Sequence, residues 1–434
     1  MFNRIYCVPT HRKMDHRNIH SYFNEVKYAN TKFSQDILLV FFEDQDEKIN
    51  LEDILYASQN YSDVKYLYIT RNEIKNLLDL IYRKLPRKSK AIFKKMYPGE
   101  NVNYGNIFNR IFIFAILVGA DFIHRRDSDI QIDIDSNNRR VYPIDAEMVN
   151  LGRETSDGCI YICGGGYKGK YNIDIEGLIK DNGKDYSLVK QLFSCMSIPD
   201  SIHDNIISTE LIGNNQPFTS DSIIENSENY PECGNLSVYR LFRFFPSSCQ
   251  DFILGSDYFF IDVAACTGLN ICYHNRAVIH QYTSERKANN IRIYNYWKGF
   301  LMLIDSQTYY HKFYESYLIG KKIELANSES NWSDSFIKNM KLCLKSFNNE
   351  FYEERKLKLL DSISILSQTQ DNGILKSLDI LSSEIDYIID CTDIAIRQHI
   401  KLLKEWNNIV SVIDSIRSSN DVNNYLEAFI RHAN

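Results

Sequence analysis

Short apolar runs alternate with helix-length segments through the first third of the chain. The strand-like runs are residues 4–8, 36–42 and 66–69, and the helix-like segments are residues 13–29, 51–59 and 72–84. The helix over 72–84 is expected to open at Asn72. Alternation at this spacing is typical of a mostly parallel sheet covered by helices. The sequence therefore predicts an α/β fold for this part of the chain.

The rest of the chain divides into two regions of different character. Residues 141–285 have shorter strand-like runs and more Gly, Asn and Ser, with Gly164, Gly165, Gly166 and Gly169 close together. These glycines predict either a mobile loop that closes over a ligand or a plain turn between strands. From residue 288 onward the spacing of apolar residues is helical and few Pro or Gly interrupt it.

Composition narrows the classes of function. The chain has 434 residues and a net charge of −6, which argues against a general nucleic-acid-binding surface. The basic stretch at 83–95 is interpreted as a solvated helical face. Ten scattered cysteines without repeated CxxC spacing, and a polar N-terminal stretch, favour a cytoplasmic protein with reduced thiols. The longest apolar run, 111–120, is too short for a transmembrane segment.

Two carboxylates separated by one residue, Asp127 and Asp129, follow a predicted helix over 104–118 and a short extended segment. Side chains at i and i+2 of a strand point the same way, so the pair could hold a divalent cation. Such a pair is weak evidence by itself. Asp133 and Asp135 form a second pair, but they are followed by the turn signature at 136–138.

Flanking segments give the first pair a context. Residues 8–12, Val-Pro-Thr-His-Arg, resemble the end of the first strand in glycosyltransferases of the GT-A fold. Glu43 and Asp44 resemble the carboxylates which that family uses near the base and ribose. Residues 103–110 resemble the segment and helix that precede the family's Asp-x-Asp motif.

The resemblance implies a GT-A core over 1–287 with a Rossmann-like, mostly parallel sheet and a helical C-terminal region. Its units would be 1–150 for the nucleotide sugar, 151–287 for the acceptor, and 288–434, which would support acceptor specificity or a homodimer. The implied metal ligands, for Mn²⁺ or Mg²⁺, are Asp127, Asp129 and His280. The implied nucleotide-binding residues are Pro9, Thr10, His11, Arg12, Asp44, Asn103, Arg110, Asp127 and Ser128.

Asp257 is the implied catalytic residue, because an acidic residue opens a helix on the acceptor side in many metal-dependent members of that family. We expect this helix to run to Cys266. Asp262 and Glu285 are the reserves. Plainer readings stay open: Asp257 and Ser256 could cap the helix, and His280 could be an ordinary hydrogen-bonded histidine.

These observations predict a metal-dependent glycosyltransferase that moves a sugar from a UDP- or GDP-sugar to an unidentified acceptor. One alternative is a nucleotidyltransferase, although residues 9–13 lack the glycine-rich, lysine-containing loop typical of sugar nucleotidyltransferases. Another is a non-catalytic binding protein with the same fold. The donor, the acceptor and the stereochemical course are not encoded in short motifs.

Overall fold

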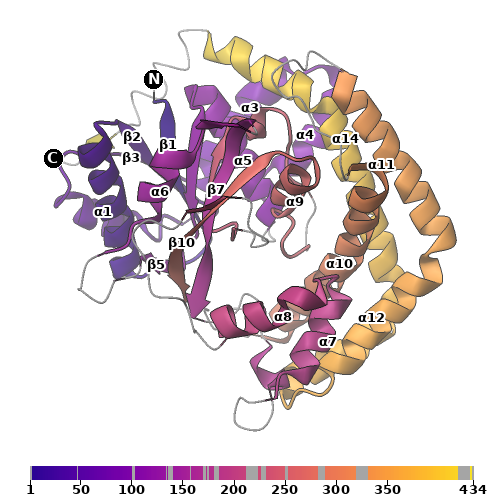
Figure 1. The fold of residues 1–434 in the computed structure, drawn as a ribbon. Helices are drawn as coiled ribbons and strands as arrows, with labels where there is room; N and C mark the ends of the chain where they lie inside the picture. The colour runs from indigo at the N-terminus through magenta and orange to yellow at the C-terminus, as the bar shows by residue number, and fades with distance from the viewer. Residues whose placement is uncertain are drawn as a thin grey trace.

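The computed structural model is an α/β core joined to a region of long helices (Figure 1). None of its described helices has both the length and the apolar content needed to span a bilayer. The residues that the structure describes are 2–45, 47–99, 103–132, 134, 140–156, 158–169, 173, 175–179, 185–211, 223–225, 231–249, 253–281, 289–318, 331–418 and 431–432.

The first part of the chain forms four parallel strands in the order β3-β2-β1-β4. The strands are β1 (Arg4–Thr10), β2 (Ile37–Glu43), β3 (Lys65–Ile69) and β4 (Phe122–Arg126), and the helices are α1 (His16–Phe33), α2 (Leu51–Ser58), α3 (Arg71–Lys84), α4 (Arg87–Phe93) and α5 (Tyr104–Val118). Each element predicted here is confirmed. The observed bounds differ from the predicted ones by up to four residues. At α3, Thr70 rather than Asn72 caps the helix, through a capping box with Glu73. The basic stretch lies on the end of α3 and on α4, where Lys84, Arg87 and Lys88 are exposed.

The middle part extends the sheet to the order β11-β3-β2-β1-β4-β9-β7-β10-β5. Its elements are β5 (Ile130–Ile132), α6 (Pro143–Asn150), β6 (Glu154–Thr155), β7 (Gly158–Gly169), α7 (Ser187–Cys195), α8 (Asp200–Ile206), β8 (Ile223–Glu225), β9 (Asn235–Tyr239), α9 (Phe259–Cys266), β10 (Asn270–His280) and, near the C-terminus, β11 (Arg431–His432). Strand β9 is antiparallel to both β4 and β7, so β7 and β10 point the same way as β1 to β4. The predicted fold class, α/β with a mostly parallel sheet, is confirmed.

The prediction of a loop or turn at the glycine cluster is wrong. All four glycines lie in β7, which pairs with β9 and β10. A Cβ on Gly164 would stand 2.6 Å from the carbonyl oxygen of Asn235, and one on Gly165 would stand 2.7 Å from the His274 ring. Glycine is required here because neighbouring groups approach the strand closely.

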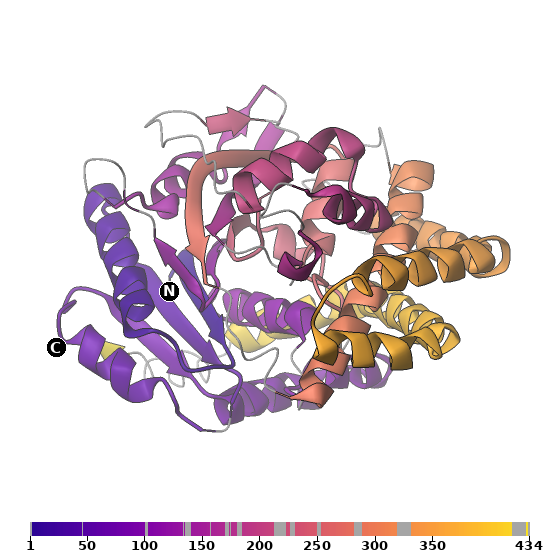
Figure 2. The ribbon, with the colours of Figure 1, turned by 90° about the horizontal axis from the view of Figure 1, so that it is seen from below.

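The predicted helical C-terminal region is also confirmed. It comprises α10 (Asn290–Phe313), α11 (Asn331–Glu350), α12 (Tyr352–Leu366), α13 (Asn372–Ser382) and α14 (Ile385–Arg417). Arg355 on α12 joins three of these helices, because its guanidinium donates to Asp305 on α10 and to Asp393 on α14. In Figures 1 and 2, α1 lies on one side of the sheet, and α11 to α14 curve around the other side.

The two faces of the sheet bury separate apolar layers. Alternate residues of β1 divide between them: Cys7 packs with α5 and α14, and Tyr6 and Val8 pack with α1. Helix α5 is buried along its whole length between the sheet and α14. This burial explains why its second half, residues 111–118, is apolar all round rather than on one stripe.

A network of buried charges fastens β4 to the helices on the α1 face. Arg126 forms ion pairs with Glu25 of α1 and Glu147 of α6, both at 2.9 Å, and all three side chains are fully buried. Glu147 also accepts a hydrogen bond from Nδ1 of His124 at 2.7 Å. Burial raises the pKa of Glu147, but Arg126 and His124 outweigh it and hold that pKa well below its usual value. One buried cation therefore binds two buried carboxylates within the core.

Replacing Arg126 with Met should lower the free energy of unfolding by about 3 to 5 kcal/mol, because it leaves two buried carboxylates without their cation. Urea denaturation measures this change. The matched control is Arg240→Met, which breaks the exposed Arg240–Asp121 pair and should cost less than about 1 kcal/mol. Equal losses in the two variants would contradict a structural role for the network.

Candidate functional site

Most of the sequence-predicted site residues lie at one edge of the sheet. Strands β1, β2, β4 and β10 point the same way and end at Thr10, Glu43, Arg126 and His280. Asp44 and Asp127 are the residues directly after β2 and β4. The carboxyl ends of parallel strands are where open α/β sheets bind ligands.

Asp129 sits between a cation and an imidazole. Its Oδ2 accepts a hydrogen bond from Nη1 of Arg12 at 2.8 Å and lies 3.7 Å from Nε2 of His280. All three residues are buried. His280 is held by Tyr167, whose ring stacks on the imidazole with a centroid distance of 4.9 Å. The structure thus brings together side chains from β1, from the segment after β4, and from β10.

Asp127 is bound by two other groups. Its Oδ1 accepts from Nη2 of Arg125 at 2.9 Å, and its Oδ2 accepts from the Tyr167 hydroxyl at 3.0 Å. Burial raises the pKa of Asp127, but the charge of Arg125 and the Tyr167 hydrogen bond outweigh it, and the pKa lies below its ordinary value. Asp127 is therefore ionised at neutral pH.

Arg125 also connects this acidic pair to Asp257. Its Nη1 donates to Oδ2 of Asp257 at 2.8 Å, and its guanidinium lies over the Phe108 ring. Asp257 is buried just before α9, which begins at Phe259. The reading of Asp257 and Ser256 as helix caps is wrong, because α9 has no side-chain cap hydrogen bond. Ser256 instead accepts from the backbone N–H of Gly105 at 2.9 Å.

The acidic segment, residues 127–129, has each of its backbone carbonyl oxygens bound by a hydrogen-bond donor. The Tyr22 hydroxyl donates to the carbonyl oxygen of Asp127 at 2.8 Å. The side-chain amide of Asn18 donates to the carbonyl oxygen of Ser128 at 3.4 Å. The backbone N–H of Gln281 donates to the carbonyl oxygen of Asp129 at 2.8 Å. Two residues of α1 and the residue after β10 thus fix where the carboxylates stand.

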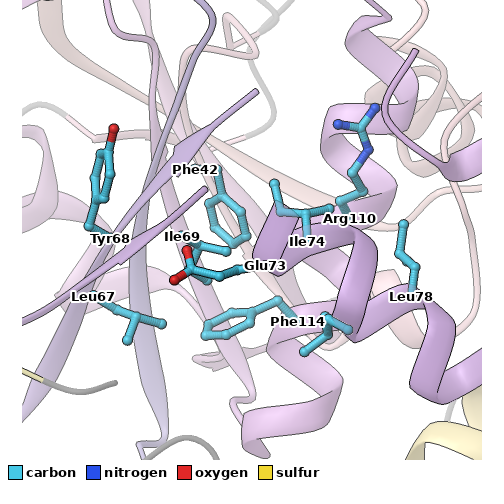
Figure 3. Close-up of a pocket in the computed structure, with 10 residues that line it drawn as sticks. Phe42, Leu67, Tyr68, Ile69, Glu73, Ile74, Leu78, Arg110 and Phe114 are labelled. Carbon is cyan, nitrogen blue, oxygen red and sulfur yellow. The ribbon is translucent and has the colours of Figure 1, made fainter. Parts of the chain in front are cut away.

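A second cluster of predicted residues surrounds a small hollow beside β1 and β2. Pro9, Thr10, Asp44 and Arg110 line it, and Arg110 donates to Asp44 Oδ1 at 2.9 Å. A larger apolar hollow adjoins it and shares Arg110 with it. Figure 3 shows Phe42, Tyr68 and Ile74 around this space, which encloses about 500 Å³ including volume open to solvent.

The other site residues predicted from the sequence lie outside these two clusters or beside them. His11 lies beside Arg12, with Nε2 of His11 3.3 Å from Nη2 of Arg12. Asn103 is buried and accepts from the backbone N–H of Asn106, so its side chain caps α5. Burial raises the pKa of the reserve residue Asp262 to about 7. Asp133, Asp135 and Glu285 lie outside the described residues.

Several contributors to the site were not predicted from the sequence, among them Arg125, Tyr167 and Gly234. A Cβ on Gly234 would overlap both the Tyr167 hydroxyl and the Asp127 carboxylate, so only glycine permits their hydrogen bond. The one available signal was Arg125 and Arg126 themselves, since two charges in a central strand require partners.

The donor types suit a divalent ion, although the protein supplies few of them. Among the described residues there is no group of three or more His, Cys, Asp or Glu side chains placed to share one metal ion. Asp129 and His280 offer one oxygen and one nitrogen donor within reach of a common ion. A carboxylate with an imidazole suits Mn²⁺, whereas Mg²⁺ prefers oxygen alone.

The fold and this edge define an α/β protein with an acidic polar site at the carboxyl ends of its central strands. A family model described as "Family of unknown function (DUF6271)" matches residues 4–421, so the chain belongs to that family. No curated protein matches the sequence.

Two solved structures show a distant likeness. Glucosyl-3-phosphoglycerate synthase from Mycobacterium tuberculosis, in complex with Mn²⁺, UDP and phosphoglyceric acid, has 10% identity and a TM-score of 0.37, covering 70% of this chain and 78% of that one. Mannosyl-3-phosphoglycerate synthase from Rubrobacter xylanophilus has 12% identity and a TM-score of 0.36, covering 69% and 72%. At these TM-scores the likeness carries no inference about this chain.

Glu43, at the end of β2, should make stability depend on pH. Burial raises its pKa to about 7, against the opposing hydrogen bonds from Asn50 and Tyr68. The folded state therefore holds this proton more tightly than the unfolded state, and stability should fall as pH rises from about 4.5 to 7. Glu43→Gln should remove about 1 to 3 kcal/mol of that fall.

Chemical denaturation at pH 4.5, 6 and 8 checks this expectation. The control is Glu52→Gln, an exposed carboxylate on α2, which should leave the pH profile unchanged. A parallel profile for Glu43→Gln and the native chain would show that the pKa of Glu43 is the same in the folded and unfolded states, and would contradict this expectation.

Proposed function

We propose that this protein is a metal-dependent glycosyltransferase that uses a nucleotide-diphosphate sugar as donor. The observation that carries the proposal is the convergence of Arg12, Asp127, Asp129 and His280 at the carboxyl edge of the sheet, beside the hollow formed by Pro9, Thr10, Asp44 and Arg110. The carboxylate and imidazole donors could bind an ion with the charged diphosphate, and the neighbouring hollow could hold the uncharged part of a nucleotide.

Asp129 and His280 would hold Mn²⁺ or Mg²⁺, with Asp127 binding through water or reaching the ribose. Such an ion neutralises the charge that develops on a nucleoside-diphosphate leaving group. Arg12 now occupies the Asp129 oxygen nearest His280, so it would have to release that oxygen when the ion binds. A freed Arg12 guanidinium would then be available to a phosphate oxygen.

The nucleotide would lie along β1 and β2. Pro9 and Thr10 supply one wall of the hollow, while the paired Asp44 and Arg110 supply hydrogen-bonding groups. His11, Asn103 and Ser128 complete the proposed nucleotide-binding set. This assignment puts the donor in the half formed by residues 1–150 of a GT-A core.

Asp257 would act on the acceptor, in the half formed by residues 151–287. A carboxylate there can take the proton of an acceptor hydroxyl or only orient that hydroxyl. Its contact with Arg125 ties it to Asp127, so donor and acceptor groups share one cation. The acceptor and the stereochemical course follow from neither contact.

The two alternatives have less support. A nucleotidyltransferase would need backbone N–H groups after β1 that a triphosphate can approach, and residues 9–13 have no glycine to permit that approach. A binding protein without catalysis would not require a buried carboxylate at the Asp257 position, where burying the charge is costly.

Asp129→Asn should abolish metal-dependent binding of the donor. In a thermal-shift panel of UDP-, GDP- and CDP-sugars, the native chain should be stabilised by one nucleotide class, and more strongly with Mn²⁺ than without it. A ligand at about 100 times its dissociation constant adds about 2.7 kcal/mol to apparent stability. Asp121→Asn, at the opposite end of β4, is the control and should retain the shift. Absence of any shift in the native chain would refute the proposal.

Asp257→Asn should retain the donor-induced thermal shift but lower kcat for release of nucleoside diphosphate by about 10² to 10⁴. The substrate for this assay is the donor that gives the largest shift, tested in water and with a panel of hydroxyl acceptors. Loss of turnover in Asp262→Asn, with Asp257→Asn unaffected, would assign the role to the reserve residue instead.

A further inference from the structure

Two histidines one turn apart stand at the start of α1, outside the acidic site. His16 and His20 are related as i and i+4, so their side chains lie on the same face of the helix. Their rings approach with a centroid distance of 4.4 Å, and the two Nε2 atoms are 3.1 Å apart. Two nitrogens that bind one tetrahedral ion at about 2.0 to 2.1 Å would be roughly 3.3 Å apart.

Tyr61 is the outer partner of His20. Its hydroxyl donates to the carbonyl oxygen of His20 at 3.3 Å and lies 3.2 Å from Nδ1 of the same residue. With the hydroxyl proton on the carbonyl side, Nδ1 donates to the hydroxyl oxygen, and the Nε2 lone pair of His20 is directed toward His16. Metal-bound histidines commonly have their second nitrogen held by an outer partner in this way.

The surroundings leave the paired imidazoles accessible to solvent. His20 is half-buried at the start of α1. His16 is exposed, and the exposed ring of Tyr56 on α2 lies 5.5 Å from it. Water can thus reach the paired nitrogens and complete a coordination shell.

We propose that His16 and His20 form a second metal site, which binds a transition-metal ion of the Zn²⁺, Ni²⁺ and Cu²⁺ class. Neutral imidazole nitrogens are ligands for these ions and not for Mg²⁺, so the site differs in chemistry from the acidic edge. When the ion binds, the ring proton of His16 moves to Nδ1 and both Nε2 lone pairs face the metal. Water supplies the remaining ligands.

This ion would fasten the part of α1 that supports the acidic pair. Asn18 lies between the two histidines and donates to the carbonyl oxygen of Ser128, and Tyr22 follows one turn later and donates to that of Asp127. An ion across the first two helical turns opposes fraying at this end, where backbone N–H groups lack intrahelical partners. The proposal does not depend on glycosyl transfer.

Titration calorimetry with NiCl₂ tests the site on the full chain without an affinity tag, in the native chain and in Asp129→Asn, which removes the carboxylate of the acidic edge. One Ni²⁺ should bind in the Asp129→Asn background, and adding either His16→Gln or His20→Gln to that background should abolish this binding. Tyr61→Phe should weaken it by about tenfold or more, since it removes the outer partner of His20. Arg17→Gln, on the same helical turn but paired with Asp15, is the control and should bind as the native chain does.

Cu²⁺ electron paramagnetic resonance gives a second readout, in which hyperfine splitting from two nitrogens should disappear in either histidine variant. Circular dichroism of each variant checks that the chain keeps its overall helix content. Unchanged Ni²⁺ affinity when His20→Gln is added to Asp129→Asn, or no Ni²⁺ binding by Asp129→Asn itself, would overturn the proposal. The second result would mean that the two rings share only an N–H to N hydrogen bond.

Discussion

Two adjacent arginines on the central strand β4 bind carboxylates on opposite faces of the sheet. Arg126 pairs with Glu25 and Glu147 among the helices on the α1 face, and Arg125 pairs with Asp127 and Asp257 on the other side. Because successive side chains of a strand alternate between faces, one short strand anchors both the scaffold and the acidic site. The core network on the α1 face and the geometry of the carboxylates therefore cannot shift independently.

Sequence periodicity was sufficient to predict the helices and strands whose conformation is determined by residues close to them in the sequence. Helix α5 was predicted with the bounds that it has, because Asn103 caps its start and Gly119 adopts the left-handed conformation at its end. The glycines of β7 were wrongly predicted to form a loop or turn, because the groups that require glycine there are distant in sequence. Gly164 is required by the backbone of Asn235 and Gly165 by the His274 ring, and both partners are distant in sequence.

The candidate site was predictable to the extent that parallel strands share a carboxyl edge. Arg12 and His280, far apart in sequence, meet at Asp129 because β1 and β10 both end there. The partner of Asp257 could not be inferred, since its contact with Arg125 depends on how the segment before α9 packs against β4. Tyr167 was not predicted as a site residue, because the strand that carries it was predicted to be a loop or turn. Metal binding and catalysis by these residues stay predictions.

The antiparallel strand β9 has a consequence for the order in which the chain folds. It pairs with β4 on one side and with β7 on the other, so among the strands that the structure describes it is β9, residues 235–239, that joins the two parallel halves of the sheet. During synthesis, β1 to β4 can assemble long before that strand exists, which leaves an open edge at β4. Pairing over so long a sequence separation is intrinsically slow. Asp127 donates its backbone N–H to Gly234, directly before β9, so the acidic segment reaches its final position only when the sheet closes.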